Sequence, residues 1–571
     1  MSIFSSIRVR KPKRNLFNLS HEVKLTMKMG DLVPFFCEPV VPGDTFKVQT
    51  EMLMRFMPLI APVMHRINVY THFFFVPNRL IWDHWKDFIT GTPDRNGEQY
   101  IYPRCLLDSN EVRKFFTNGS LADYLGFPIP DSSLTSDDLA GLRVDMLPFR
   151  AYQLIYDEYY RDQNLTNEIS IQRDVSGEHD FIPGVTDGLF DLRKRCWEKD
   201  YFTSALPWPQ KGEEVTLPMS GNVPIRYNED STKVFPDGLP LHLTSYGSNS
   251  DGSLKSGSFT TIPSSVTGSY KFPNGNVTQN NGKTYIDGQP VAYSPEGTLT
   301  VPQSAVQFGL EADMSDVNST TINELRRAMR AQEFLEKDAR GGSRYIEQIF
   351  SHFGVKSSDS RLQRPEYLGG GKAPVVIGEV LQTSETSQSS AQANPSGTGM
   401  AAGRSHSFKR FFEEHGYVIG IISILPRTSY QQGLPRKYQK FDRYDYYWPE
   451  FSHLGEQEVK SSEIFFDFKK WFEPSEDSLF GYQSRYSEYK YLPSRVCGDL
   501  KDTLKYWHLG RIFDNVPKLN DNFVTARPSD RIFAVQEDES GDNKNFDSIV
   551  VDLYNNISAK RPMPKYGTPT L

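Results

Sequence analysis

The residues best suited to chemistry form an aromatic and acidic segment, Tyr444–Glu450 (YDYYWPE). Carboxylates beside Trp and Tyr side chains are typical of a glycosidase or a sugar-binding cleft. A glycosidase, however, needs two carboxylates that flank the bond it cleaves, and one short segment supplies no such separation. The same aromatic side chains, among them Tyr446 and Trp448, also fit internal packing or a subunit interface. The segment by itself leaves these interpretations open.

Two glycine-rich stretches resemble nucleotide-binding loops but fail the test of spacing. A P-loop needs a Gly five positions before its final Gly, and Ser or Thr after its Lys. Around Leu368–Lys372 (LGGGK) these positions hold Glu366 and Ala373. Gly397–Ala402 (GTGMAA) matches a loose dinucleotide fingerprint, but it lies in a polar stretch and follows no predicted strand. We therefore predict no nucleotide cofactor.

Histidines and cysteines predict neither a metal site nor a nucleophile. The sequence contains no HExxH motif and no GxSxG motif. Its densest histidines, His65, His72 and His84, lack i,i+4 spacing, so structural roles are expected. The four cysteines, which show no CxxC pair and no metal-ligand spacing, are Cys37, Cys105, Cys196 and Cys497. We expect reduced cysteines, no metal, no cofactor and no enzymatic activity.

Composition favours a sandwich of strands. Aromatic residues make up 13% of the 571 residues, and 37 Pro and 41 Gly are scattered among them. Aromatic strands separated by Pro and Gly turns suit a β-sandwich better than a helical protein. The net charge of −7 argues against nucleic-acid binding over the whole surface. No apolar run approaches the roughly 20 residues that span a bilayer, and no secretory signal is expected.

Residues 1–18 form a basic arm. Its clustered bases, with no acid among them, are Arg8, Arg10, Lys11, Lys13 and Arg14. Such arms commonly contact phosphates without reading a base sequence. We predict local contact of the arm with phosphates, with a merely solvated tail as the alternative.

The rest of the chain, residues 19–571, reads as one β domain with insertions. Strand-like runs near residues 20–80, 373–425 and 495–540 are predicted to build a sandwich. Helices are expected between them, including a pair that begins at a Thr321–Glu324 capping box and is divided by two glycines at 341–342.

Two polar stretches are predicted as surface loops. Residues 213–310 are rich in Gly, Ser, Asn and Thr, but aromatic residues recur between Asn-Gly turn signals, which favours short hairpins over disorder. Residues 382–403 form the second polar loop. A loop as long as the first is usually functional or disordered.

Several long blocks, in a fixed order, resemble one family. The signature segment is Glu333–Gly371 (EFLEKDARGGSRYIEQIFSHFGVKSSDSRLQRPEYLGGG). The other blocks are Leu19–Phe46, Ala61–Trp85, Asp200–Gly212, His415–Gly433, Asp445–Gln457 and Tyr486–Phe513. Together they resemble the major capsid proteins of gokushoviruses (Microviridae, Gokushovirinae), which are small single-stranded DNA bacteriophages.

The resemblance implies an eight-stranded antiparallel jelly-roll β-sandwich of the viral capsid type, with large helical and loop insertions. It implies a T=1 icosahedral shell around circular single-stranded DNA, assembled in the bacterial host cytoplasm and present in the virion. Expected partners are other copies around the fivefold, threefold and twofold axes, the packaged DNA, a small basic DNA-binding virion protein, an internal scaffolding protein, a pilot protein and a host cell-surface receptor. No membrane insertion is expected.

The resemblance also places candidate contact residues, and it implies that the basic arm faces and binds the packaged DNA. The 213–310 insertion would project at the threefold axes and attach to the host, with receptor candidates Tyr270, Phe272, Asn274 and Tyr285. Extended, aromatic segments would lie at subunit edges, with interface candidates Arg361, Arg364, Tyr367, Tyr446 and Trp448. Competing functions are a phage receptor-binding spike protein, which would stop at trimers, and a β-sandwich glycoside hydrolase.

Overall fold

The computed structural model describes residues 13–106, 113–131, 134, 139, 142–179, 187–213, 215, 322–381, 383, 395–468, 479–534 and 547–566; within residues 225–312 it describes only the backbone of the strands. Backbone contacts divide the chain into two compact units. One, here called the body, comprises Met1–Glu214 and Gln332–Leu571. The other, the insertion unit, comprises Val215–Ala331. The protein is mainly β, with antiparallel sheets.

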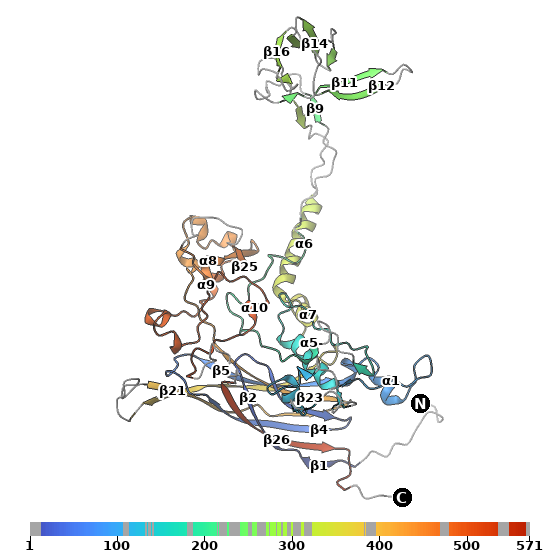
Figure 1. Cartoon of the computed structure of the whole chain (residues 1–571), viewed down its shortest axis with the longest axis vertical. Coiled ribbons are helices and arrows are strands. Elements are labelled where there is room, and N and C mark those ends of the chain that lie inside the picture. The colour runs from blue at the N-terminus through green and yellow to red at the C-terminus, as the bar shows by residue number, and fades with distance from the viewer. Residues whose placement is uncertain are drawn as a thin grey trace. The chain divides into compact units, whose positions relative to one another are not determined.

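The first sheet of the body has β26 and β4 at its centre (Figure 1). Its strands are β1 (Asn15–Asn18), β2 (His21–Met27), β4 (Thr45–Phe56), β20 (Val376–Leu381), β21 (Pro395–Arg404), β22 (Phe408–Phe411) and β26 (Ile549–Arg561). The order is β1-β26-β4-β21-β20, with β2 also paired to β26 and β22 to β4. Every pairing is antiparallel, so segments far apart in the sequence become neighbours.

The second sheet faces the first across a shared hydrophobic core. It consists of β3 (Val33–Val40), β5 (Ile67–Pro77), β19 (Glu366–Pro374) and β23 (Gly416–Pro426), in the order β19-β5-β23-β3. Phe73 of β5 and Leu553 of β26 belong to the same buried cluster, although they lie in different sheets. The two sheets therefore form an antiparallel sandwich.

The two sheets differ in what covers their other faces. Along β26, Ile549, Val551 and Leu553 are fully buried, whereas Val550 and Tyr554 are 42% and 40% exposed. This period of two marks a strand with one buried face. Both faces of β5 are buried, because Phe74 packs into a second cluster of helical side chains. A strand buried on both faces reads as a continuous apolar run.

A helical layer covers the second sheet. It contains the 3-10 turn η2 (Asn78–Leu80), α1 (Trp85–Thr90), α3 (Leu121–Leu125), α4 (Leu147–Ile155), the π-helical turn η3 (Tyr156–Tyr160) and α5 (Asp187–Phe190), beside a small sheet of β6 (Arg104–Leu106), β7 (Arg143–Asp145) and β8 (Glu178–His179). The fully buried Tyr152 of α4 donates a hydrogen bond to the Leu32 carbonyl, 2.7 Å away. This bond ties the layer to the chain just before β3.

A third region of the body is built from short elements around its own apolar cluster. They are the 3-10 turns η5 (Arg436–Tyr438), η6 (Arg443–Asp445), η7 (Pro449–Phe451), η9 (Gly498–Lys501) and η10 (Lys505–Trp507), the strands β24 (Glu456–Lys460) and β25 (Leu479–Ser484), and the helices α8 (Ser461–Ile464), α9 (Ser487–Lys490) and α10 (Asp521–Val524). Short turns therefore make up much of this region.

The predicted helix pair is present as α6 (Ile322–Gly341) and α7 (Tyr345–Phe353). Gly342 and Gly354 follow the two helices with φ of +94° and +67°, a conformation that suits glycine. The His352 ring lies 2.7 Å from an Asp338 carboxylate oxygen, so the two helices are held together. The predicted capping residue Thr321 lies outside the described residues.

Short strands fill the insertion unit, in agreement with the predicted hairpins. They are β9 (Ile225–Tyr227), β10 (Pro240–Leu241), β11 (Leu243–Ser248), β12 (Leu254–Phe259), β13 (Tyr270–Phe272), β14 (Gly275–Asn280), β15 (Lys283–Ile286), β16 (Gln289–Tyr293), β17 (Leu299–Thr300) and β18 (Leu310–Ala312). β14 and β15 pair in antiparallel fashion on either side of the Asn-Gly pair at residues 281–282.

Two sequence-based expectations need correction. The last sandwich strand is β26, whereas the described part of the predicted 495–540 stretch, residues 495–534, forms 3-10 turns and loops with one short helix. Pro395–Arg404 is β21 rather than the end of a polar loop, because it pairs with both β20 and β4. Most of the predicted 213–310 insertion falls within the compact unit Val215–Ala331, and the expectation of a single domain stays a prediction.

Candidate assembly surfaces

An exposed aromatic patch is the most prominent feature of the third region. Its side chains, between 36% and 82% exposed, are Tyr438, Phe441, Tyr444, Tyr446, Tyr447, Trp448, Tyr489, Tyr491 and Leu492. Two of the predicted interface residues, Tyr446 and Trp448, belong to it, at 54% and 46% exposed. Large exposed apolar patches on soluble proteins mark interaction sites, and Tyr and Trp are enriched there.

The patch rests on a buried ion pair. Lys440 Nζ lies 3.5 Å from Glu488 Oε1, and these side chains are only 6% and 8% exposed. The same ammonium group lies 3.8 Å from the centroid of the Tyr489 ring and 5.5 Å from that of Tyr446. Gln457 Nε2 donates a hydrogen bond to the other Glu488 oxygen at 2.8 Å. A cation held in this way fixes the rings around it.

The contacts of Tyr486, a residue in a strained backbone conformation, also fix the patch. Its φ of +60° is unusual for a residue with a side chain. The Tyr486 amide donates to Gln457 Oε1 at 2.9 Å, and its hydroxyl lies 3.3 Å from the Trp448 amide. The Tyr447 and Tyr486 rings meet edge to face with centroids 5.0 Å apart. The loop is therefore preorganised, which lowers the entropy that binding costs.

The carboxylate at the centre of the patch is unsuited to proton donation. Asp445 Oδ2 accepts hydrogen bonds from the amides of Phe441 and Asp442, both at 2.9 Å. These bonds lower the pKa of Asp445, because they stabilise its charged form. A glycosidase acid needs the opposite shift. The geometry thus favours the interface interpretation of this segment over a sugar-cleaving site.

The other predicted interface segment divides into exposed and buried residues. Arg361 is exposed, and Tyr367 of β19 is 48% exposed beside the ring of His72. Arg364, by contrast, is 8% exposed, with its guanidinium 4.3 Å from the centroid of the Tyr159 ring and its Nε 3.3 Å from an Asp359 oxygen. Arg364 therefore braces its own subunit.

The predicted DNA-binding arm is described only at its end. Lys13 and Arg14 are exposed just before β1, and the Arg14 guanidinium lies 5.1 Å from the centroid of the Phe411 ring. The remaining arm residues, Arg8, Arg10 and Lys11, lie outside the described residues.

The predicted receptor residues lie in the insertion unit. Tyr270 and Phe272 are in β13 and Tyr285 is in β15, where only the backbone is described. Asn274 lies outside the described residues.

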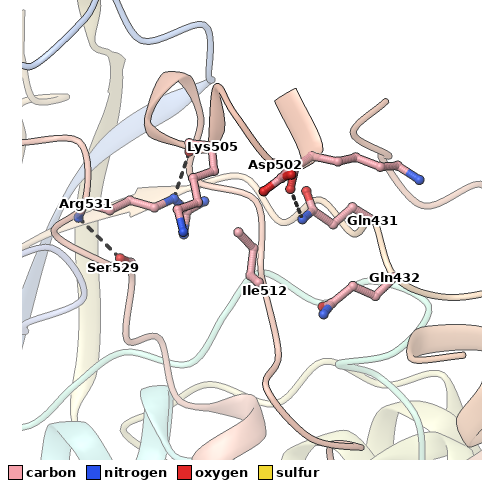
Figure 2. A pocket seen from close by; sticks show the side chains of 8 residues that line it. Gln431, Gln432, Asp502, Lys505, Ile512, Ser529 and Arg531 are labelled. Atoms are coloured by element: carbon pink, nitrogen blue, oxygen red, sulfur yellow. Dashed lines mark hydrogen bonds between the residues drawn. The ribbon is translucent and has the colours of Figure 1, made fainter. Parts of the chain in front are cut away.

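Figure 2 shows a polar pocket of about 600 Å³ whose lining residues mainly brace loops. Arg531 donates hydrogen bonds to the carbonyls of Lys505, His508 and Gly510 at 2.7–2.9 Å. Gln431 Nε2 donates to the Lys501 carbonyl at 3.0 Å. The guanidinium and this amide nitrogen are thus engaged by the protein itself, and the lining contains no paired nucleophile and base.

A second pocket, of about 450 Å³, lies against a buried carboxylate. Glu463 accepts hydrogen bonds from the Tyr201 hydroxyl at 2.8 Å and the Lys460 amide at 3.0 Å, and Arg436 lies 3.3 Å away. Burial raises the pKa of Glu463 despite these contacts. The arrangement supports the loops beneath the aromatic patch, since Tyr438 and Tyr491 line the same pocket.

Sequence reasoning missed the buried carboxylate Asp200, which is 5% exposed. Its Oδ1 accepts from the amides of Phe202 and Thr203 at 2.9 and 2.8 Å. Its Oδ2 accepts from the hydroxyls of Thr428 and Tyr430 at 2.6 and 2.7 Å. Asp200 is the first residue of Asp200–Gly212, one of the blocks that carry the family resemblance. That position was the signal in the sequence that could have identified it. Asp200 joins the chain after the helical layer to the chain after β23.

No group of His, Cys, Asp and Glu that could hold a metal ion occurs among the described residues. Within the same part of the chain, no helix is long and apolar enough to cross a membrane.

An antiparallel sandwich that displays a rigidly held aromatic patch suits a structural protein that contacts other chains. The family comparison agrees with this class. The chain belongs to the family described as capsid protein (F protein), whose model matches residues 5–571.

Three relatives carry the name Capsid protein VP1. The chain is 38% identical to that of Chlamydia phage 1 over 610 aligned positions, covering 100% of this chain and 97% of the relative. It is 34% identical to that of Bdellovibrio phage phiMH2K, covering 97% and 95%. It is 29% identical to that of Spiroplasma virus 4, covering 100% and 97%. The sequence-based identification as a gokushovirus major capsid protein, a component of the virion, is confirmed.

Proposed function

We propose that copies of this chain assemble into a T=1 icosahedral shell around circular single-stranded DNA. The family match along residues 5–571 carries the proposal. The two-sheet sandwich supports an eight-stranded jelly roll as the underlying fold, with the additional strands as elaborations. A closed shell needs heterologous contacts around its fivefold and threefold axes.

The aromatic patch supplies one such contact surface. Its rings are exposed in the isolated subunit yet held rigidly from below by Lys440 and Tyr486. Rigid aromatic anchors contribute most to association, because little entropy is lost when they are covered. Tyr367 and Arg361 contribute a second surface. Arg364 contributes indirectly, because it holds the loop that carries Arg361 and Tyr367.

The basic arm contacts the packaged DNA through its phosphates. Arg8, Arg10, Lys11, Lys13 and Arg14 give the arm five positive charges in a chain whose net charge is −7. The further virion partners are a small basic DNA-binding protein, an internal scaffolding protein and a pilot protein. The insertion unit, with Tyr270, Phe272, Asn274 and Tyr285, projects at the threefold axes and binds a host cell-surface receptor.

Electron microscopy of the protein, expressed alone and together with its phage neighbours, tests the proposal. We expect uniform icosahedral particles with projections at the threefold axes. Particles without projections would contradict the role of the insertion unit only. Discrete trimers under both conditions would favour a receptor-binding spike, and monomers would favour a β-sandwich glycoside hydrolase.

Deletion of residues 1–14 tests the arm separately. We expect shells that retain less DNA, and that lose it at lower salt, because fewer phosphates are neutralised. Lys13 and Arg14 changed to Ala, with residues 1–12 kept, should give an intermediate loss. Unchanged DNA content in the deletion variant would contradict DNA binding by the arm.

A further inference from the structure

β20 (Val376–Leu381) is an open edge of the first sheet. It pairs with β21 on one side, and no described strand pairs with its other side. Val376, Val380 and Leu381 are 65%, 47% and 48% exposed. An unpaired edge presents free amide and carbonyl groups to any strand of matching length.

Natural proteins usually protect such edges, and β20 has little of the usual protection beyond the charge of Glu379. Lys, Pro, a bulge or a covering helix blocks unwanted pairing. The edge strand β3 has two prolines, Pro34 and Pro39, and α3 packs beside it. The sequence of β20, VIGEVL, contains no Lys, Arg or Pro. Among the described edges of the sandwich, this strand is largely apolar and exposed, and Glu379 is its single charged side chain.

The strand is also complementary to itself. Val376 lies opposite Met400 and Gly378 lies opposite Thr398 in the pairing with β21, so Val376, Gly378 and Val380 share one face. About a twofold axis through Gly378, perpendicular to the sheet, Val376 would lie opposite Val380 of a second copy. In that register each Glu379 faces Ile377 rather than the other Glu379.

The neighbouring register is unfavourable. An axis moved by one residue would set the two Glu379 carboxylates directly opposite each other, where like charges destabilise a strand pair. The charge pattern of β20 therefore favours an axis through Gly378 over an axis through Glu379.

We propose that β20 pairs in antiparallel fashion with β20 of a second copy across a twofold axis, so that the first sheets of two subunits become continuous. The occupant is a second copy because an icosahedral shell brings identical surfaces together at every twofold axis. The inference rests on the proposed shell function. It adds a main-chain contact to the side-chain contacts of the aromatic patch.

Gly378→Cys tests the pairing by disulfide formation. Directly opposite residues in an antiparallel pair have Cα atoms about 4.5–5.5 Å apart, within the range that a disulfide spans. A Cβ at residue 378 meets only Thr398, at 3.4 Å or more, so the variant should fold. The full-length protein is assembled into particles in a Cys497→Ser background, since Cys497 is exposed. The particles are then oxidised and run on a non-reducing gel.

We expect most chains of the Gly378→Cys particles to migrate as dimers, with a 378–378 cross-link identified by mass spectrometry. Thr398→Cys on β21 is the matched control. Its position would lie about 14 Å from its counterpart, three strand spacings away, and should give no dimers. Normal particles without the 378 cross-link would overturn the pairing while leaving the shell function intact. Failure of the unsubstituted protein to form particles would instead overturn the proposed function.

A charge exchange provides an independent test. Val376→Lys and Val380→Glu should each lower the particle yield by about three- to tenfold, since a cross-strand pair contributes up to about 1 kcal/mol and occurs twice at each axis. The double variant should recover the yield, because the introduced ammonium group of one copy would face the introduced carboxylate of the other. Within one chain these positions lie about 13 Å apart, so recovery reports contact between copies. A double variant whose loss of yield combines the two single losses would contradict the register, and it is the result expected if β20 pairs with another virion protein instead.

Discussion

At the scale of single residues, Asp200 is predicted to make a large contribution to stability. Its carboxylate accepts hydrogen bonds from the amides of Phe202 and Thr203 and from three hydroxyls, those of Thr203 and of the distant Thr428 and Tyr430. Asp200→Asn replaces one acceptor oxygen with a donor group and leaves buried donors without partners. We expect a loss of about 2–4 kcal/mol in the free energy of unfolding, measured by urea denaturation of the subunit. The exposed Asp502→Asn should change it by less than about 0.5 kcal/mol.

A second prediction concerns pH. Desolvation, with a smaller contribution from Arg195, lowers the pKa of His72 to about 4. In the unfolded chain the pKa is about 6.5, so the unfolded state binds more protons between these values. The contribution of neutral His72 to stability is therefore complete above pH 6.5 and is lost as the pH falls toward 4.

The thermal midpoint, followed from pH 7 to pH 4.5, checks this prediction. The unsubstituted protein should lose more stability on acidification than His72→Gln, by a difference of the order of 2 kcal/mol. Other titrating groups, such as Asp31, whose pKa burial raises, are common to both proteins and cancel in the comparison. Parallel curves for the two proteins would contradict the assignment.

Sequence can supply residue types but not their partners. The aromatic character of Tyr446 and Trp448 marks them as contact residues, and both are exposed. Arg364 belongs to the same kind of segment, yet it is buried against Tyr159, more than 200 positions away. Local composition cannot distinguish these outcomes, because burial depends on which distant segment folds over the residue.

At the scale of elements, β26 holds the first sheet together, since β1, β2 and β4 all pair with it. Leu553 of this strand is fully buried, and its neighbour Tyr554 is 40% exposed. Leu553→Ala should lower the free energy of unfolding by about 2–5 kcal/mol, because it leaves a cavity in the sandwich core. Tyr554→Ala, on the same strand, should cost less than about 1 kcal/mol. Equal midpoints in urea would contradict the assigned faces.

Strands are predicted near residues 495–540, whose described residues form none, while β26 goes unpredicted. In β26 the apolar Ile549, Val551 and Leu553 recur at a spacing of two, and this spacing carries the strand signal, although more aromatic segments are more conspicuous. The Tyr506–Phe513 stretch is aromatic too, but it forms a 3-10 turn and a loop. Arg531 donates hydrogen bonds to the backbone carbonyls of His508 and Gly510 in this loop, where a strand would pair with another strand. Aromatic content is therefore a weaker indicator of a strand than its period of two.

At the scale of the whole molecule, the division into body and insertion unit predicts that the two can be separated. Both sheets of the sandwich, the aromatic patch and β20 belong to the body. A chain in which residues 228–309 are replaced by a short Gly-Ser linker should still form particles, with a yield within about twofold of the full chain, because long surface insertions contribute little to the core. Adsorption to host cells should be lost. Particle counting and an adsorption assay measure the two effects independently.

The pairing of β1 with β26 has a consequence for the timing of synthesis. Asn15 lies opposite Arg561, so a strand made early waits for one made more than 500 residues later. At about 5–20 residues per second, the ribosome needs about 25–100 s to supply the missing partner. During that delay β2 and β4 lack their central neighbour, and the nascent chain has no finished sandwich. Each copy therefore becomes competent to join a shell only after β26 has emerged, which keeps partly translated chains out of the growing particle.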